Sequence, residues 1–396
     1  MSGTPVFLGQ PGIVCALGSG IDAVRARLLA TDAPHGLAMT DALTPGRTLA
    51  LGFAAAELHD LSDCVPALRS RNNALLRMAY QQIAAQVASA LDCYGPERVA
   101  VVLGTSTSGI SQAEHAYFYR HAHGGFPSEF DYAQQEIGAP SRFIAVESGA
   151  RGPAWTISTA CSSSAKALAS AARLLRAGIA DAVIAGGADS LCRFTVAGFS
   201  ALEAVSAARC NPFSRNRAGI NIGEGSALFL MSRQPGPVRL SGWGENSDAY
   251  HMSAPEPSGA WAMAAIDEAL RRAQIAPSDV GYLNLHGTAT PLNDAMESRA
   301  VTQALGCDIA ASSTKPLTGH TLGAAGAVEA ALCWATLHGN AQQRLPPHWW
   351  DGEADAALPR LNLAAPGAVA PKPLKHALSQ NFAFGGSNAA LIFSAE

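Results

Sequence analysis

The chain has 396 residues, of which 48% are hydrophobic and 15% charged, a composition that excludes a disordered protein and suits an α/β protein with a large interior. Its 27 basic and 31 acidic residues leave a net charge of −4, and the basic residues are scattered singly or in pairs, which argues against nucleic-acid binding. At about 100 to 200 residues per domain, the length allows one large unit or two to three domains.

The N-terminal half predicts a βαβ unit. Apolar residues recur at helical spacing in 72–91, and β-branched runs mark buried strands. The predicted elements are a helix at 72–91, a strand at 98–106, a strand at 154–159, a helix at 163–178 and a strand at 181–189. Residues 111–143 are rich in aromatic side chains without a clear period, so we interpret them as an insertion or cap.

The C-terminal half repeats this order, with predicted helices at 259–275, 293–306 and 323–339 and a strand at 280–287. Residues 340–373 are rich in proline and indicate loops. The two similar halves meet near Ser232–Gly242, which indicates an internal structural duplication without obvious sequence repetition. We therefore divide the chain into an N-terminal half, 1–235, and a C-terminal half, 236–396.

Cysteine usage and apolar segments indicate the compartment. Neither CxxC nor any paired spacing occurs among the eight cysteines, which disfavours a disulfide framework or zinc site. The opening MSGTPVFLGQPGIVCALGSG has no basic region before its apolar residues and does not resemble a secretory signal. Glu329 and several glycines interrupt the apolar stretch 320–339, which argues against a membrane span. We expect a cytoplasmic protein.

Cys161 lies among small residues at a predicted strand-to-helix junction, in STACSSSAKAL. The free N–H groups and the positive end of a helix dipole lower the pKa of a thiol and favour the thiolate, so this position suits a nucleophile. A buried cysteine that simply fills the junction is an equally good interpretation of this stretch alone. A nucleophilic cysteine also needs a partner, usually a histidine that the fold brings near.

Two of the eleven histidines stand out by their context. His286 ends an apolar run in YLNLHGTATPLND, and the end of such a strand faces the crevice where α/β folds place their sites. His320, in KPLTGHTLGAAGAVEAA, precedes a helix rich in glycine and alanine. Each of them alone would more often be structural. His121 and His123 form an HxH pair, which is a weak metal signal by itself.

Six segments together resemble the β-ketoacyl-acyl carrier protein synthases of the thiolase superfamily, over nearly the whole chain. These segments are GPAWTISTACSSS, NPFSRNRAGINIGEGSALFL, DAYHMSAPEP, LHGTATPLND, STKPLTGHTLGAAGAVEA and NFAFGGSNAALIF. The resemblance implies a thiolase-like fold with five layers, αβαβα. It places the nucleophilic cysteine in the N-terminal half and both catalytic histidines in the C-terminal half.

The resemblance also implies the chemistry. Cys161 would take an acyl chain from a carrier-protein thioester. His286 and His320 would polarise the carbonyl of a malonyl thioester and help its decarboxylation, after which the carbanion attacks the acyl-cysteine and extends the chain by two carbons. Two neutral Nε donors suit the developing enolate oxygen.

Further roles follow from the same resemblance. The backbone N–H groups of Cys161 and Phe384 would form an oxyanion hole for the acyl carbonyl. Gly385 and Gly386 would let their loop move, so that Phe384 gates the acyl tunnel. The remaining matches are Lys315 and Glu329, which would hold the histidine region, Thr288 and Thr290, which would grip the phosphopantetheine arm, and Asp294 and Glu224, which would be structural. Neither a metal nor a cofactor is expected beyond the phosphopantetheine arm of the acyl carrier protein.

Other classes fit less well. A chain-length-factor-like relative, which shapes the site without catalysis, would lack the nucleophile, whereas Cys161 and both histidines are present. A biosynthetic thiolase needs a second cysteine near the C-terminus, and none follows Cys333. Starter-condensing synthases replace the second histidine by asparagine, which His320 disfavours. An α/β-hydrolase would need a GxSxG motif, which is absent.

The predictions of the pathway and the partner depend on similarity to particular subfamilies of these synthases. The phrases SRNNALL, GTSTSGI, DSLCRFTVAGFSALEAVSAARCNPFSRNR and INIGEGSALFL look most like the ketosynthases of bacterial aryl-polyene pigment clusters; housekeeping fatty-acid elongation is the alternative. The resemblance implies an acyl carrier protein as partner and either a homodimer or a heterodimer with a chain-length-factor-like ketosynthase. We expect the strand at 181–189 to continue the sheet across that dimer.

Overall fold

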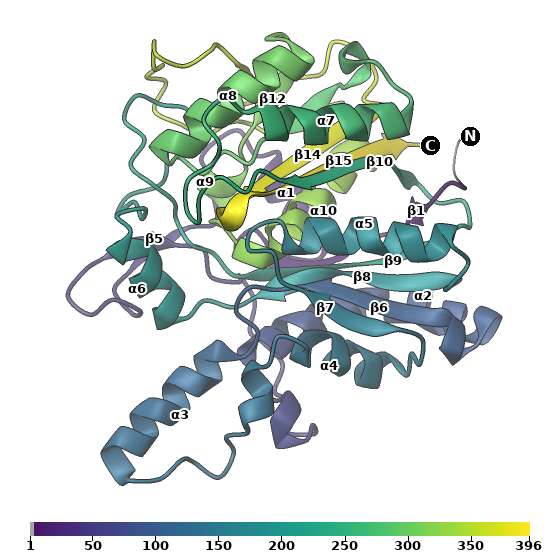
Figure 1. Ribbon diagram of the computed structural model, residues 1–396, viewed down its shortest axis with the longest axis vertical. Helices are drawn as coiled ribbons and strands as arrows, with labels where there is room; N and C mark the ends of the chain where they lie inside the picture. Colours follow the sequence, from purple (N-terminus) through teal and green to yellow (C-terminus); the bar gives the residue numbers. More distant parts are fainter. Residues whose placement is uncertain (1–3) are drawn as a thin grey trace.

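The computed structural model describes residues 4–396 and stacks helices and sheets in five alternating layers (Figure 1). One outer layer holds α2 (Arg71–Tyr94) and α4 (Ala139–Ser148), and the other holds α7 (Ala260–Ala273) and α8 (Pro291–Leu305). The helices α1 (Ile21–Leu28), α5 (Ser163–Arg176) and α10 (Ala325–Leu337) form the middle layer. The predicted αβαβα architecture is confirmed.

The sheet of the N-terminal half is built around three parallel strands, β6 (Val99–Gly104), β7 (Ala154–Ile157) and β8 (Ala182–Asp189). β6 pairs in parallel with both β7 and β8, and β8 pairs antiparallel with β9 (Gly225–Ser232). All residues of β6 and β8 are buried because α2 covers one face of this sheet and α5 covers the other.

The C-terminal half repeats this arrangement. β11 (Tyr282–Asn284) pairs in parallel with β12 (Ala310–Ser312) and β14 (His376–Ala383), and β14 pairs antiparallel with β15 (Ser387–Ala395). The same order of pairings in both halves is the structural duplication that the sequence predicted. The strand β10 (Val238–Ser247) flanks β15, and the short β1 (Phe7–Leu8) pairs with both β9 and β10, which joins the halves at one rim.

The central helices α5 and α10 approach closely because small residues face one another. A Cβ at Gly326 of α10 would overlap the backbone of Ala165 on α5, so this contact requires glycine. Every residue of α10 is buried. This contact brings the start of α5, next to Cys161, within reach of the buried Glu329 of α10.

The shorter elements connect these layers. They are β2 (Gly12–Cys15), β3 (Gly18–Ser19), β4 (Ala38–Thr40), β5 (Leu49–Leu51), η1 (Pro66–Leu68), η2 (Pro96–Arg98), α3 (Ile110–His123), η3 (Tyr132–Gln135), α6 (Arg193–Ala201), η4 (Pro277–Asp279), α9 (Lys315–Thr318), η5 (Leu322–Ala324), β13 (Asn362–Leu363) and η6 (Phe384–Gly386). The segment 111–143, interpreted as an insertion or cap because its sequence has no clear period, contains most of α3, which projects from the layered body in Figure 1.

The expectation that the strand at 181–189 continues the sheet across a dimer is wrong. This strand is β8, whose edges are both occupied, by β6 on one side and β9 on the other. Its glycines leave space for that pairing, since a Cβ at Gly186 would overlap the carbonyl of Ala227. Within residues 4–396 the end strands of the sheet are β13 and β7, and β7, the end strand on the side of the N-terminal half, is paired only with β6. A partner subunit that extends the sheet from the N-terminal half would therefore meet β7.

Residues 1–3 of the predicted N-terminal half lie outside the described residues. Over residues 4–396, no helix combines the length and the apolar character needed to cross a membrane.

Candidate active site

Cys161 lies in a tight turn between the end of β7 and the start of α5. Ala160 adopts φ +50°, a left-handed conformation that is sparsely populated for residues with a Cβ. The Ser163 hydroxyl closes the turn, since it donates to the Ala160 carbonyl at 2.6 Å and accepts from the Thr159 N–H at 2.9 Å. The strained turn presents the Cys161 side chain to a cavity while only 6% of the residue is exposed.

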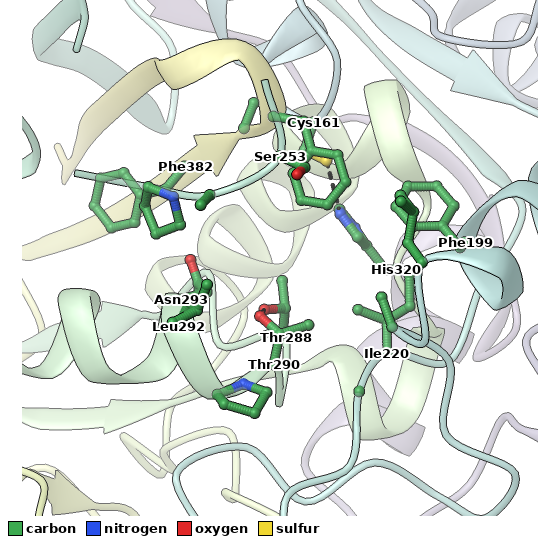
Figure 2. Close-up of a pocket in the computed structure, with 18 of the residues that line it drawn as sticks. Cys161, Phe199, Ile220, Ser253, Thr288, Thr290, Leu292, Asn293, His320 and Phe382 are labelled. Atoms are coloured by element: carbon green, nitrogen blue, oxygen red, sulfur yellow. Dashed lines mark hydrogen bonds between the residues drawn. The ribbon is translucent and has the colours of Figure 1, made fainter. Parts of the chain in front are cut away.

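The Cys161 thiol faces His320, with 2.9 Å between Sγ and Nε2, and Figure 2 shows this hydrogen bond at the edge of the cavity. Burial raises the pKa of Cys161 to about 12, and the Lys315 ammonium and a hydrogen bond from the Phe384 N–H only partly oppose this shift. The raised pKa contradicts the expectation that the position at the helix start favours the thiolate. Burial also holds the pKa of His320 well below its usual value, so a neutral thiol faces a neutral imidazole.

His286, just beyond the end of β11, lies next to the same pair. The His286 and His320 rings meet edge to face with their centroids 5.3 Å apart. Lys315 Nζ lies 3.4 Å from His286 Nδ1, and because an ammonium can only donate, the neutral ring carries its proton on Nε2. Burial, followed by the charge of Lys315, holds the pKa of His286 well below its usual value. His286 therefore presents an Nε2–H donor to the cavity.

Lys315 is itself held by a buried ion pair. Its Nζ donates to Glu329 Oε1 at 2.6 Å, and the other carboxylate oxygen accepts from Asn381 Nδ2 at 2.6 Å. Burial raises the pKa of Glu329, and the Lys315 ammonium opposes this shift. The structure thus brings together Lys315 and Glu329 behind His286, where the sequence analysis expected them to hold the histidine region.

A second buried carboxylate, Glu297 of α8, supports the backbone of the His286 loop. Its oxygens accept from the N–H groups of His286 and Gly287 at 2.6 and 2.7 Å. They also accept from the side-chain amides of Gln380 at 2.6 Å and Asn293 at 3.1 Å. Burial is the main cause that raises the pKa of this carboxyl to about 7. Because four N–H donors surround it, this position suits a carboxylate, whose oxygens accept hydrogen bonds, and does not suit a side chain that donates them.

Replacing this carboxylate is expected to loosen the His286 loop. In Glu297→Gln the amide nitrogen would face N–H donors, leaving at least one of them buried and unpaired, which costs about 2–3 kcal/mol. We expect a lower urea midpoint and slower condensation. Glu353→Gln, which removes only an exposed ion pair with Arg215, is the control and should change the midpoint far less. An unchanged midpoint in Glu297→Gln would contradict the supporting role.

Phe384 begins a glycine turn between β14 and β15. Gly385 and Gly386 adopt φ +79° and +75°, and a Cβ at Gly386 would overlap the Asp248 carboxylate. The Gly385 N–H donates to the Met252 carbonyl at 2.8 Å, which fixes the turn in the observed position. The Phe384 ring packs against the ring of Phe199 of α6 in a tilted arrangement, with the centroids 5.6 Å apart, and lines the cavity.

These residues line one cavity of about 380 Å³. Cys161, His286, His320 and Phe384 line it, together with Thr288 and Thr290, whose hydroxyls are 3.0 Å apart. Figure 2 shows these two hydroxyls side by side on the wall of the cavity. The thiol and both hydroxyls therefore border the same space.

The Cys161, His286 and His320 donor atoms lie within 4.8 Å of one another, close enough to test as a metal site. A metal ligand must offer a lone pair, whereas the Lys315 contact occupies the lone pair of His286 Nδ1 and leaves the proton on Nε2. The ammonium also adds a positive charge beside the cluster. This donor set fits hydrogen bonding to an oxyanion better than it fits a cation.

Comparison with known proteins gives the family. Residues 73–235 match the family described as "Beta-ketoacyl synthase, N-terminal domain", and residues 238–348 match "Beta-ketoacyl synthase, C-terminal domain". The chain belongs to the β-ketoacyl synthase family. It is accordingly a condensing acyltransferase that joins an acyl group to a carrier-bound malonyl unit, on a thiolase-type fold.

Individual relatives agree with this assignment. The chain is 33% identical to a 3-oxoacyl-[acyl-carrier-protein] synthase 2 of Synechocystis sp., over 75% of each chain. It is equally 33% identical to a putative polyketide beta-ketoacyl synthase 1 of Streptomyces cyaneus, over 76% of each. Among solved structures, the ketosynthase ApeO of Xenorhabdus doucetiae, in complex with its chain length factor ApeC, matches with a TM-score of 0.93, 44% identity and coverage of 99% of this chain and 98% of that one.

Sequence reasoning missed Glu297 and Asn381 as supports of the site, although one signal was available. Asn293, Asp294 and Glu297 are buried polar residues at helical spacing on the inward face of α8. Asp294 fixes a neighbouring loop, since it accepts from the Phe213 N–H at 2.7 Å. Charged residues on the inward face of a predicted helix indicate a buried polar network.

Proposed function

We propose that Cys161 is the acylated nucleophile of this ketosynthase and that His320 assists its loading. The thiol attacks the carbonyl of an acyl carrier-protein thioester, a new C–S bond forms, and the carrier thiol leaves with the proton that His320 relays. The 2.9 Å contact between Sγ and Nε2 supports this relay. The Cys161 and Phe384 N–H groups receive the carbonyl oxygen as it becomes negative.

In the second half-reaction, His286 and His320 hold the carbonyl oxygen of the malonyl thioester. Loss of CO₂ leaves an enolate, and the two Nε2–H groups stabilise its charge. The enolate carbon attacks the acyl-cysteine carbonyl, the C–S bond to Cys161 breaks, and the thiol recovers a proton. Lys315 and Glu329 orient His286, and Thr288 and Thr290 hold the pantetheine arm. No metal and no cofactor other than that arm takes part in the proposed reaction.

The acyl chain in this proposal is an aryl polyene, and the 44% identity with ApeO over nearly the whole chain carries the assignment. This identity exceeds the 33% shared with the synthase 2 of Synechocystis, which corresponds to the fatty-acid alternative. Intact-mass measurement of the carrier-protein products tests it. Aryl-primed, conjugated products are expected, whereas saturated chains made equally well would favour fatty-acid elongation.

We further propose that the partner subunit is a chain-length-factor-like ketosynthase, by analogy with the complex in which ApeO was solved. The segment 110–132, which contains α3, and the nearby α6 expose large apolar side chains that a monomer would leave in water. These are Tyr117, Phe118, Phe126, Tyr132 and Phe194. The open edge of β7 adds unpaired backbone groups. Acyl carrier protein and a cytoplasmic location complete the proposal.

Light scattering on the protein expressed alone and with its neighbouring synthase-like subunit tests this pairing. A heterodimer that forms and becomes active only on co-expression is expected. Phe118→Asp places a charge in the exposed apolar patch and should weaken assembly, whereas Glu353→Gln, on an exposed ion pair elsewhere, should not. A stable, active homodimer would favour the homomeric alternative, and a monomer with full activity would contradict both.

A further inference from the structure

The Ser387 hydroxyl, at the start of β15, joins two segments that lie on opposite sides of the thiol. Lys166 of α5 donates from Nζ to Ser387 Oγ at 2.5 Å. The hydroxyl of Ser162, the residue next to Cys161, lies 2.9 Å from the same oxygen. Ser387 directly follows the glycine turn of Phe384, so one hydroxyl connects the nucleophile turn with the Phe384 loop.

The donors and acceptors order these groups into a chain. An ammonium can only donate, so Ser387 accepts from Lys166 and keeps its own proton to give. The Ser162 hydroxyl donates to Ser387 Oγ and also lies 2.8 Å from the Thr159 carbonyl, which accepts from it. The chain therefore runs from Lys166 through Ser387 and Ser162 to Thr159, within the strained turn that presents Cys161.

Both ends of this hydrogen-bond chain lie in segments whose backbone N–H groups would form the acyl oxyanion hole. At one end, the turn fixes the N–H of Cys161; at the other, Ser387 holds the end of the Phe384 loop, whose two glycines adopt positive φ. We propose that Lys166 is a positioning residue that, through Ser387, sets the distance between the Phe384 loop and Cys161, so that both backbone N–H groups reach the acyl carbonyl together. The inference rests on the proposed acylation of Cys161.

The placement of Lys166 supports this role. The side chain is partly buried, and burial, followed by the like charge of Arg173, lowers its pKa. A lysine that served only solubility would extend into water. The Lys166 ammonium instead loses part of its hydration, which costs free energy, and donates to a hydroxyl beside the active site. Neither Lys166 nor Ser387 lines the cavity, so each acts through the backbone it holds.

The test separates the two half-reactions in the full-length protein, co-expressed with its partner subunit. Lys166→Met keeps an unbranched side chain that is only one atom shorter and removes the donor. We expect it to slow acylation of Cys161 by acyl carrier protein roughly tenfold, less than the ~10²–10³ that deleting an oxyanion donor costs. Release of CO₂ from malonyl carrier protein by the pre-acylated protein depends on the histidines and should change less than about threefold.

Three further variants make the result decisive. Lys166→Arg keeps a charged donor and should restore much of the acylation rate. Ser387→Ala should match Lys166→Met, and the double variant should be no slower than either, because both remove one link. Equal losses in both half-reactions, no loss at all, or no recovery in Lys166→Arg would overturn the inference. A wild-type protein that is not acylated at Cys161 would defeat the proposed function itself, and the inference with it.

Discussion

Cys161→Ala should abolish loading of the acyl chain and lower condensation at least roughly 10³-fold, because no other group in the cavity can form the thioester. Peptide mapping after incubation with acyl carrier protein should find the acyl group on Cys161 in the wild-type protein and nowhere in the variant. The pKa alone does not predict this, because burial raises the pKa of Cys210 to about 12 as well. What distinguishes Cys161 is the imidazole 2.9 Å away and the cavity in front of it.

Cys210→Ala is therefore a matched control. Cys210 is as buried as Cys161 and has the same raised pKa, but it does not line the cavity. We expect this variant to load the acyl chain at close to the wild-type rate. An acyl group found on Cys210 or Cys192, or normal condensation by Cys161→Ala, would contradict the assignment of the nucleophile.

The layered fold could be predicted because buried strands and amphipathic helices leave separate periodic signals. The helix α3 was missed because its sequence carries no such periodic signal. It projects from the body, buries only Ala113 and Ala116 along its length, and exposes Tyr117 and Phe118, so its apolar residues follow no single stripe. Without such a stripe, the sequence pattern gives no helical period from which α3 could be predicted.

The position of a strand within a sheet was harder to predict than its existence. The apolar run of β8 suggested an interface strand, but its buried glycines instead allow close pairing on both sides, as at Gly186 against Ala227. The less buried β7, with the exposed Ala154, lies at an edge of the sheet. Pairing partners come from distant segments, and apolar character alone does not tell an edge from a centre.

The candidate site likewise has residues that the sequence could predict and features that it could not. The motifs located Cys161, His286 and His320, because their chemistry depends on residue type and local context. The argument from the helix start failed for the thiol pKa, since a local dipole was weighed without the burial that the rest of the fold imposes. Glu297 was missed because it acts on backbone N–H groups, which no side-chain motif records.

The two histidines are expected to differ in the half-reaction that they serve. His286→Ala removes a fixed Nε2–H donor that does not contact the thiol, so acylation of Cys161 should stay within a fewfold of wild type while decarboxylation falls roughly 10²–10³-fold. His320→Ala should lower both steps, because His320 contacts the thiol directly. Acylation should remain measurable in both variants, since neither is the loaded group.

The unequal surroundings of the two rings explain this difference. Lys315 fixes the tautomer of His286, whereas His320 Nδ1 is buried without a hydrogen-bond partner within residues 4–396. With its proton on Nδ1, His320 can accept the thiol proton on Nε2 during loading and pass it to the departing carrier thiol. Because no hydrogen bond within the described residues fixes Nδ1, the ring can then change to the tautomer with the proton on Nε2, which donates to the enolate. Single-turnover acylation and CO₂ release measure the two steps separately, with the exposed His338→Ala as control. Loss of loading in His286→Ala, or full-rate loading in His320→Ala, would show that the roles are divided differently.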